Sequence, residues 1–532
     1  MGHDALTWRA MGYHTDQWIG WLLPLAAEWW PDRDALVLAD ERITFAALAV
    51  RSRQIAAQLT ALGIGPGDTV SWTLGNSVDA VAVASAIWHV GATSNPVVPI
   101  YRAHELTAVL TQVRPAAVVV PSDYRGRDYT AEFDEVLATT DLRLRGRIVA
   151  GEGRDGWQPL TTAAAGGDAP DIDVTSRPGD APCLVLFTSG TTSAPKGAVH
   201  TSATLLHECR AMATDWALTW RDAMFMASPL THITGLLQGF LVPAMTGATA
   251  VLQDRWDRDA AIELIESEGV TYAAGATPFL QGIVDAYTRR GTRPTTLRQF
   301  TSGGASVPPQ LIEDADGLGI AAHRLWGMTE LPTATRANDT VDLWHRAHTD
   351  GQVAIGVQAE AVDAQRQPLP PGSEGELRIR GPERMVGYLD PAMDVEAIDA
   401  DGWFYTGDVG VVSADGFVSI TGRIKEIINR GGEKFSVRDI EEAILRHPQV
   451  SDVAVVGVPD DRLGEGVAAV VVADVADAGA LHPPLAGFLE DLGLARQKLP
   501  TTVVVATDLP RTASGKLRRN QIVDDLTTGR RP

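Results

Sequence analysis

The chain has 532 residues, of which 45% are hydrophobic and 21% charged, which is too long for one compact domain and apolar enough for a large core. Lys and Arg total 45 against 67 Asp and Glu, a formal net charge of −22, and this acidic balance argues against a general nucleic-acid binder. The two cysteines, Cys183 and Cys209, are too few for a disulfide framework or a multi-cysteine zinc site. We expect both to be buried and inert in a reducing, cytoplasmic setting.

Helical and strand patterns alternate along the chain, as is typical of α/β proteins. Apolar spacing predicts helices over 43–62 and 78–90, the first of which ends at Gly63. Strands are predicted, in chain order, at 69–73, 116–120, 184–187, 298–301 and 323–326. Each of the last three runs directly into a polar segment that contains glycine. Ligands bind at the carboxyl ends of strands in open parallel sheets, so we expect these segments to meet at one crevice.

The composition changes near residue 420, after a surface connection predicted over 151–182. A helix is predicted to begin after Ser436 as its N-cap and to end before Pro448. Strands are predicted over 452–458, 467–473 and 502–505. The sequence therefore predicts two domains, of which the second is a small α+β unit. The first twenty residues lack the apolar stretch of a signal peptide, and the roughly 18 unbroken apolar residues of a membrane span do not occur in the sequence.

The strongest chemical signal follows the strand predicted at 184–187. The residues from Thr188 to Gly197 read TSGTTSAPKG and combine hydroxyls, glycines and one lysine. Backbone N–H groups, hydroxyls and a lysine can surround phosphate oxygens. The pattern differs from that of P-loop NTPases, because Pro195 stands where glycine is needed and Gly197 where Ser or Thr is needed. An ordinary polar turn is the alternative interpretation, but so dense a run is unusual for one.

Several further motifs follow in a fixed order, and together with this loop they resemble the adenylate-forming superfamily of acyl- and aryl-CoA synthetases, peptide-synthetase adenylation domains and luciferases. The motifs are SPLTHITG at 228–235, SGGA at 302–305, WGMTE at 326–330, YTGD at 405–408, GRIK at 422–425 and PRTASGK at 510–516. The resemblance covers almost the whole chain. It implies a large N-terminal adenylation domain over 1–422, with mixed and parallel sheets flanked by helices, a hinge over 423–425, and a small mobile domain over 426–532.

The resemblance also implies roles for individual residues. Lys516 is implied to bridge the acyl carboxylate and the α-phosphate, and Glu330 to hold Mg²⁺ together with Thr191, as hard oxygen ligands suit that ion. The expected catalytic residues are Lys516, Glu330, Thr329 and His232. The expected ATP- and AMP-binding residues are Thr188, Ser189, Gly190, Thr191, Thr192, Lys196, Gly303, Gly304, Ala305, Trp326, Gly327, Met328, Thr329, Asp408, Arg423 and Lys516. Trp326 departs from the tyrosine common in the family, but an indole can stack on adenine equally well.

Two further sets of residues are expected to contact the acid and the thiol that accepts the acyl group. The acyl pocket is expected to be lined by Phe187, His232, Ile233, Gly235, Ser302, Gly303 and Met328. Lys425 stands at the hinge position, and the pantetheine arm is expected to pass Arg430, Gly431, Gly432 and Lys434. Ordinary structural interpretations exist for single residues: a solvated basic tail at Lys516, or a satisfied core histidine at His232. If these ordinary interpretations held throughout, the match to the family would require a separate coincidence at every motif.

We therefore predict an enzyme that uses ATP, Mg²⁺ and CoA, forms an acyl-AMP from a small-to-medium aliphatic, alicyclic or aromatic acid, and transfers the acyl group to CoA. The alternatives are a stand-alone adenylating enzyme that passes the adenylate to a carrier-protein pantetheine or to an amine, or one that uses an oxyanion such as nitrite. A luciferase-like oxygenase and a non-catalytic nucleotide-binding protein are less well supported by the motifs. The sequence leaves a homo-oligomer open.

Overall fold

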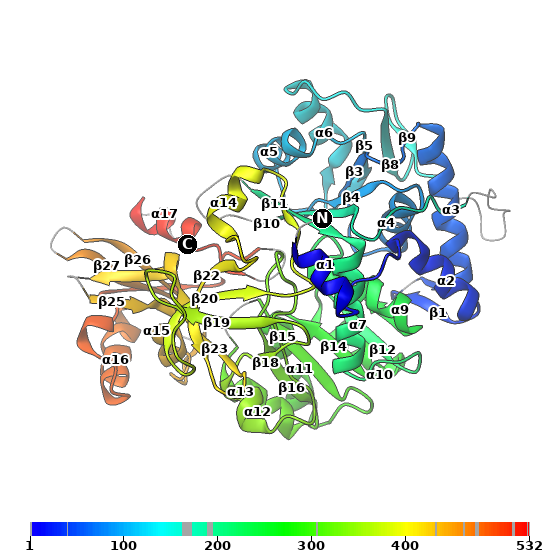
Figure 1. Ribbon diagram of the computed structural model, residues 1–532. Coiled ribbons are helices and arrows are strands. Elements are labelled where there is room, and N and C mark those ends of the chain that lie inside the picture. The colour runs from blue at the N-terminus through cyan, green and yellow to red at the C-terminus, as the bar shows by residue number, and fades with distance from the viewer. Residues whose placement is uncertain are drawn as a thin grey trace.

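The computed structural model describes residues 3–39, 41–161, 173–188, 195–304, 307–430, 433–460, 463–473, 478–512, 516–528 and 530. Two large sheets and a smaller one build the N-terminal domain, and a fourth sheet with its own helices builds a smaller C-terminal domain, drawn in orange and red at the left of Figure 1. The prediction of an α/β chain with a large N-terminal and a small α+β C-terminal domain is confirmed. Within the described residues, no helix combines the length and the apolar character that crossing a membrane requires.

The first large sheet has eight strands and carries the phosphate-loop motif. Its central strands are parallel, whereas β10 and β11 form an antiparallel hairpin. In spatial order the strands are β21 (Gly387–Tyr388), β11 (Lys196–Thr201), β10 (Pro182–Thr188), β4 (Thr93–Pro96), β3 (Thr69–Trp72), β5 (Ala117–Pro121), β8 (Gly146–Ala150) and β9 (Gln158–Pro159).

The second large sheet has seven strands, which are parallel except for the pairing of β1 with β2. In spatial order they are β16 (Ala321–Leu325), β15 (Gln299–Gly303), β14 (Tyr272–Gly275), β12 (Ala223–Met226), β13 (Thr249–Leu252), β1 (Asp34–Val37) and β2 (Arg42–Thr44). The predicted strands at 184–187, 298–301 and 323–326 therefore exist, the first in the eight-stranded sheet and the other two in the seven-stranded sheet.

Helices lie between and around these sheets, and their starts follow local hydrogen-bonding rules. The hydroxyls of Thr44 and Ser77 accept the backbone N–H groups of the first turns of α3 (Phe45–Ala61) and α4 (Val78–His89). The first of these helices starts two residues later than predicted, because residues 42–44 pair with β1 instead. One continuous core holds α4, α7 (Ser202–Asp215) and residues of both large sheets, including the buried Cys183 and Cys209.

The remaining helices of the N-terminal domain are α1 (His3–Ala10), α2 (Leu22–Trp29), α5 (Ala103–Val113), α6 (Tyr129–Ala138), α8 (Ile233–Leu236), α9 (Val242–Thr246), α10 (Arg258–Ser267), α11 (Thr277–Arg290), α12 (Pro309–Gly317), α13 (Leu343–His348) and α14 (Asp394–Ala397). A short π-helical turn, Leu237–Leu241, joins α8 to α9. Two short pairs, β6 (Asp123–Tyr124) with β7 (Arg127–Asp128) and β17 (Thr335–Arg336) with β18 (Gln352–Val353), lie in connections.

A four-stranded antiparallel sheet leads from the large sheets to the small domain. It consists of β19 (Gln358–Val362), β20 (Glu374–Arg380), β22 (Phe404–Val412) and β23 (Val418–Arg423). Its last strand ends at Arg423, and a 3-10 turn over Ile424–Glu426 follows. The change of domain thus falls beside the residues at which the sequence places the hinge.

The small domain packs three helices on a five-stranded sheet. The strands are β25 (Glu433–Ser436), β24 (Ile427–Arg430), β27 (Gly464–Ala473), β26 (Val450–Asp460) and β28 (Thr502–Ala506), and the helices are α15 (Val437–Ile444), α16 (Ala478–Asp491) and α17 (Arg519–Thr527). Ser436 caps α15 as predicted, through its hydroxyl and the Arg438 N–H. The apolar faces of α15 and α16 pack on this sheet and give the small domain a hydrophobic core of its own.

Candidate active site

The phosphate-loop motif joins the two strands of a hairpin in the eight-stranded sheet. Thr188 ends β10 and lies opposite Lys196, the first residue of β11. The loop residues Ser189, Gly190, Thr191 and Thr192 lie outside the described residues. The Lys196 ammonium group lies 5.1 Å from the centre of the Tyr388 ring, so the base of the loop presents a positive charge held by a cation–π contact.

Glu330 lies five residues beyond β16 and is buried. The Tyr388 hydroxyl donates a 2.8 Å hydrogen bond to its Oε1 atom. Burial, reinforced by the negative Glu330, raises the pKa of Tyr388, so the phenol stays protonated and keeps donating. The sequence did not predict Tyr388, which fixes the orientation of this carboxylate.

The backbone around Glu330 is held from two sides. The His200 Nε2 atom lies 2.7 Å from the Thr329 carbonyl oxygen, and burial lowers the pKa of His200 to about 4, so a neutral ring donates this bond. The Met385 N–H donates a 2.8 Å bond to the Glu330 carbonyl. Gly327 must be glycine, because a Cβ atom there would lie 2.0 Å from the Pro332 carbonyl oxygen.

Trp326, Asp408 and Arg423 form a chain of contacts in which Trp326 and Asp408 are buried and the Arg423 side chain is half exposed. The Trp326 indole N–H donates a 2.8 Å hydrogen bond to Asp408 Oδ2. The Arg423 guanidinium lies 2.7 Å from Asp408 Oδ1, and the charge of Asp408 raises the pKa of Arg423. The structure thus brings together three residues that the sequence assigned separately to the nucleotide.

Lys516 reaches this group from the small domain. A Cβ atom on Gly304, which has φ +83°, would lie 3.6 Å from the Lys516 Cε atom, so the side chain passes directly over the SGGA turn. Burial lowers the pKa of Lys516 and Arg423 lowers it further, whereas Glu330, Asp408 and Glu426 oppose the shift. The lysine motif and the motifs of the large domain therefore meet at one place.

His232 stands at the N-terminus of α8, where its Nδ1 atom accepts the Thr234 N–H at 3.4 Å. Burial, together with the positive Lys516, lowers the pKa of His232 to about 3, so its ring is neutral in the physiological range. Gly235 must lack a side chain, because a Cβ atom would lie 2.0 Å from the Pro229 carbonyl oxygen. Among the described residues, the buried hydroxyls of Thr231 and Ser302 have no hydrogen-bond partner.

The other predicted pocket residues lie on the same elements. Phe187 precedes Thr188 in β10, Ile233 is buried beside His232, and Met328 forms a tight backbone pair with Leu331. Gly303 ends β15 where a Cβ atom would lie 2.7 Å from the Leu325 carbonyl oxygen. Ala305 lies outside the described residues.

The residues assigned to the hinge and to the pantetheine arm lie at the start of the small domain. Lys425 is in the 3-10 turn and Lys434 in β25, and the side chains of both fall outside the described part of the chain. Arg430 donates to the carbonyl oxygens of Gln497, at 2.7 Å, and Leu499. Gly431 and Gly432 also lie outside the described residues, so the path of a pantetheine arm stays a prediction.

A buried ion-pair group joins the two domains beside β23. Asp350 accepts bonds from Arg324, at 2.8 Å and 3.0 Å, and from the Ile420 N–H at 2.8 Å. Arg438 of α15 lies 3.7 Å from the same carboxylate. Burial alone would raise the pKa of Asp350, but Arg324 and Arg438 together outweigh it and lower the pKa. The small domain is thus attached to the large one at a second point besides Lys516.

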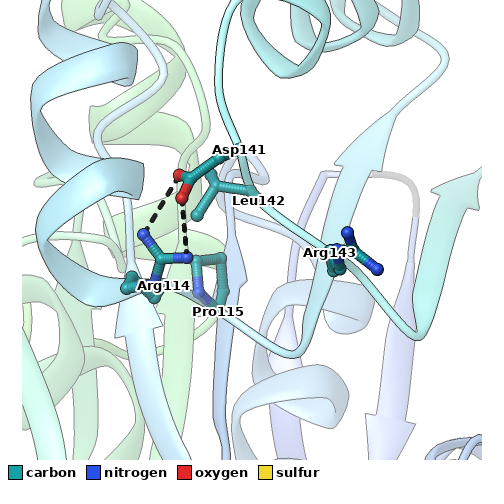
Figure 2. A pocket seen from close by; sticks show the side chains of 5 residues that line it. All are labelled: Arg114, Pro115, Asp141, Leu142 and Arg143. Atoms are coloured by element: carbon teal, nitrogen blue, oxygen red, sulfur yellow. Dashed lines mark hydrogen bonds and ion pairs between the residues drawn. The ribbon is translucent and has the colours of Figure 1, made fainter.

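A surface hollow of about 310 Å³ lies elsewhere (Figure 2). The Arg114 guanidinium and the Asp141 carboxylate form an ion pair at 3.1 Å across it, beside Pro115, Leu142 and Arg143. These residues precede β5 and β8, so the hollow is at the amino ends of the strands. It is separate from the site built on strand carboxyl ends.

The residues that the sequence assigned to Mg²⁺ suit that ion as far as they are described. Glu330 is a buried carboxylate with one oxygen oriented by Tyr388, and Thr191 lies outside the described residues. The described part of the chain contains no group of three or more His, Cys, Asp and Glu residues arranged for a metal ion. A single carboxylate fits Mg²⁺, because this ion commonly keeps water and substrate phosphates as its other ligands.

Comparison with known proteins agrees with this assembly of motifs. A family model described as "AMP-binding enzyme" matches residues 24–389, and a second, "AMP-binding enzyme C-terminal domain", matches residues 439–516. The first match ends before β22, and the second begins after the 3-10 turn over Ile424–Glu426.

Two curated relatives align over nearly the whole chain. The medium-chain fatty-acid–CoA ligase of Escherichia coli is 33% identical over 490 residues, 91% of this chain and 86% of the relative. The salicyl-AMP ligase/salicyl-S-ArCP synthetase of Mycobacterium tuberculosis is 33% identical over 538 residues, 98% of this chain and 93% of the relative. The crystal structure of ATP-bound MatB from Rhodopseudomonas palustris superimposes with a TM-score of 0.83 at 28% identity, covering 95% of this chain and 98% of that one.

Proposed function

The chain belongs to the AMP-binding enzyme family, and from this premise we propose that it joins a small-to-medium carboxylic acid to CoA with ATP as the activating substrate. In the first half-reaction a carboxylate oxygen attacks the α-phosphorus, the bond to the bridging oxygen breaks, and acyl-AMP and pyrophosphate form. In the second, the CoA sulfur attacks the acyl carbon, the thiol proton passes to solvent, and AMP leaves as the thioester forms.

One observation carries this proposal: Lys516 of the small domain lies over Gly304 and interacts electrostatically with Glu330, Asp408 and Arg423. Two anions, a carboxylate and a triphosphate, must approach each other in the first half-reaction. A positive charge fixed in a buried site stabilises the charge that develops there more strongly than water does. The Lys516 ammonium group supplies that charge between the acid and the α-phosphate.

Glu330, with Thr191, holds Mg²⁺, which when bound neutralises phosphate charge. Tyr388 binds Oε1 of Glu330 and thereby directs the carboxylate. Lys196, at the base of the phosphate loop, adds a second positive charge near the phosphates.

The nucleoside lies against the chain formed by Trp326, Asp408 and Arg423. Asp408 accepts the ribose hydroxyls, and the Trp326 ring faces adenine beside the Gly303–Gly304 turn. Because Trp326 and Arg423 both bind Asp408, the carboxylate has a fixed orientation before ATP arrives. This preorganisation lowers the ordering cost of ATP binding.

The acid is aliphatic, alicyclic or aromatic, and its pocket is lined by Phe187, His232, Ile233 and Met328 with Gly235, Ser302 and Gly303. The two relatives differ in the kind of acid that their names give: one is a medium-chain fatty-acid–CoA ligase and the other a salicyl-AMP ligase. A mixed aliphatic and aromatic wall with a neutral histidine suits an apolar acid of either kind.

Loading of a carrier-protein pantetheine is the second candidate. It is favoured by the Mycobacterium tuberculosis relative, whose name includes salicyl-S-ArCP synthetase and which aligns over 98% of this chain. Free CoA and a carrier protein present the same thiol, so the two candidates share the first half-reaction.

Pyrophosphate release across a panel of aliphatic, alicyclic and aromatic acids, with and without CoA, tests the proposal. We expect sustained release only with CoA and an acyl-CoA among the products. Adenylate that accumulates regardless of CoA would instead favour the carrier protein. If no acid releases pyrophosphate, the proposal is wrong.

Substitution Trp326→Phe is expected to raise the KM for ATP roughly tenfold with a small effect on kcat. Phenylalanine keeps an aromatic face but leaves Asp408 without the 2.8 Å indole bond, and a hydrogen bond to a charged group contributes about 1.5–3 kcal/mol. ATP titrations of wild type and variant check this, with Trp344→Phe, at an exposed tryptophan, as the control. An unchanged KM would remove Trp326 from the nucleotide site.

Substitution Arg438→Gln is expected to slow acyl-adenylate formation roughly fivefold, because about 1 kcal/mol of domain attachment is lost. Asp350 keeps its bonds from Arg324, so folding should change little. Pre-steady-state pyrophosphate release and a melting curve provide the measurement. Arg446→Gln, just beyond the end of the same helix and exposed, is the matched control; equal slowing in both variants would contradict the contact's role.

A further inference from the structure

A second group of ionisable side chains is buried behind the Glu330 segment. It contains Glu208 and His207 of α7 and Glu383, which lies between β20 and β21. Glu208 is 0% and Glu383 1% exposed. The His207 Nε2 atom is 3.8 Å from Glu383 Oε2. No motif of the sequence singled out these residues, and the proposed chemistry does not use them.

Four buried polar atoms of this group lack a hydrogen-bond partner among the described residues: Glu208 Oε2, both carboxyl oxygens of Glu383, and His207 Nε2. An unpaired buried carboxylate costs several kcal/mol. The described residues contain no three-ligand arrangement for a metal ion. Protonation lowers this cost, because a neutral carboxylic acid brings no charge into the buried site.

The surrounding charges favour protonation as well. Burial raises the pKa of Glu208 to about 7, with Asp215 adding to the shift and the Thr333 hydroxyl opposing it. Burial and then the neighbouring Glu208 raise the pKa of Glu383 well above its ordinary value. Burial lowers the pKa of His207 to about 4, so the imidazole supplies no positive charge. The other titratable or charged groups facing the cluster are Cys209, Asp215 with its partner Arg336, Arg210, His14 and Tyr13.

Both carboxyl groups are connected to Glu330. The Thr333 hydroxyl donates to Glu208 Oε1, and Thr333 is three residues beyond Glu330. Glu383 is two residues before Met385, whose N–H binds the Glu330 carbonyl. The two carboxyls thus sit where α7, which accepts the Thr333 hydroxyl, meets the segment 381–388, whose Met385 N–H bonds the Glu330 carbonyl.

We propose that Glu208 and Glu383 together retain a proton at neutral pH, and that this protonated pair is a positioning device for Glu330. The proton prevents repulsion between two carboxylates and keeps α7 and the segment 381–388 in contact. Loss of the last proton separates the two segments and turns Glu330 away from Mg²⁺. The positioning part rests on the proposed function of Glu330, whereas the presence of the proton does not.

Infrared difference spectroscopy of the whole protein tests the proton directly. The wild type at pH 7 is expected to show the C=O stretch of a buried carboxylic acid, and the band should weaken or shift in both Glu208→Gln and Glu383→Gln. Glu263→Gln, on the exposed face of α10, should leave it unchanged. No acid band in the wild type overturns the proposal, whether or not the enzyme adenylates any acid.

The pH dependence of kcat/KM for Mg·ATP tests the positioning. A glutamine amide cannot ionise, so Glu383→Gln should remain active at higher pH than the wild type. The wild type should fall roughly tenfold per pH unit once the pair loses its last proton. Lys516 titrates in both proteins, so the ratio of the two profiles reports the pair alone. Identical alkaline limbs in wild type and Glu383→Gln overturn the positioning role.

Glu383→Ala separates positioning from packing. It should lose at least tenfold in kcat/KM at pH 7, and Glu383→Gln should recover most of that loss. A Gln variant as impaired as the Ala variant overturns the proposal. If Glu383→Ala does not fold, thermal melting of Glu208→Gln replaces it. A glutamate with a raised pKa stabilises the fold less as pH rises from about 4.5 to 7, so the wild type should lose melting temperature relative to Glu208→Gln across that range. A constant difference overturns the proposal.

Discussion

Lys516→Ala is expected to slow acyl-adenylate formation by roughly 10²–10³-fold, the effect of removing one preorganised electrostatic contact to a reacting group. The lysine comes from the small domain and lies over Gly304 beside Glu330, Asp408 and His232. In the proposed first half-reaction its charge acts where the carboxylate and the α-phosphate approach. Thioester formation from supplied acyl-adenylate does not bring these anions together, so its rate should stay within about twofold.

The measurement separates the half-reactions. Pyrophosphate release from ATP and the acid reports the first, and thioester formation from synthetic acyl-adenylate and CoA reports the second. Lys498→Ala is a matched control, because it removes a small-domain ammonium group that pairs with Asp439 at 2.8 Å. Equal loss of both half-reactions in Lys516→Ala would contradict the assigned role.

Stability should not explain the loss. Burial and Arg423 lower the pKa of Lys516, which means that folding disfavours its charged form. Such a group destabilises the fold below its lowered pKa, so removal of the lysine should leave the melting temperature unchanged or slightly higher near neutral pH. A large drop in melting temperature would show that Lys516 serves structure and not chemistry.

The sequence predicted local elements well, because these follow from patterns within a few residues. The strands β3, β5, β10 and β28, the helix α4 and the Ser436 cap all lie at or within two residues of their predicted positions. The start of α3 shifted because residues 42–44 pair with β1, a tertiary contact that helix periodicity does not contain. The division of the predicted strands between two sheets likewise depends on tertiary pairing that local sequence patterns do not contain.

Contacts between distant segments form the part of the site that the sequence did not predict. Tyr388 binds Glu330 across 58 positions of the chain, and its only local signal is a Gly-Tyr pair that resembles an ordinary turn. Asp350 and Arg438 belong to different domains, and neither stands in a motif. Gly327 and Gly235 stand in motifs that the sequence identified, but the carbonyl oxygens that exclude a side chain become apparent only in three dimensions.

Glu330→Gln is expected to lower kcat/KM for Mg·ATP by roughly 10²-fold and to raise the Mg²⁺ concentration needed for half-maximal rate, because a neutral amide is a poor ligand for a hard cation. The amide oxygen can still accept the Tyr388 hydroxyl, whose bond to Oε1 measures 2.8 Å. The variant thus removes the charge and keeps the side chain's shape and orientation. The His200 ring, bonded to the Thr329 carbonyl, and the Met385 N–H, bonded to the Glu330 carbonyl, keep the segment in place.

Tyr388→Phe is the companion variant that separates charge from orientation. It keeps the Glu330 carboxylate and removes the hydroxyl that directs it, so we expect a loss of about tenfold, within the range seen when a residue behind a metal ligand is removed. Mg²⁺ titrations of pyrophosphate release compare the two variants. If Glu330 holds the ion, Glu330→Gln shifts the Mg²⁺ requirement further than Tyr388→Phe does. If neither titration differs from the wild type, the ion is held elsewhere, and Glu330 acts through its buried charge on Lys516 and Arg423.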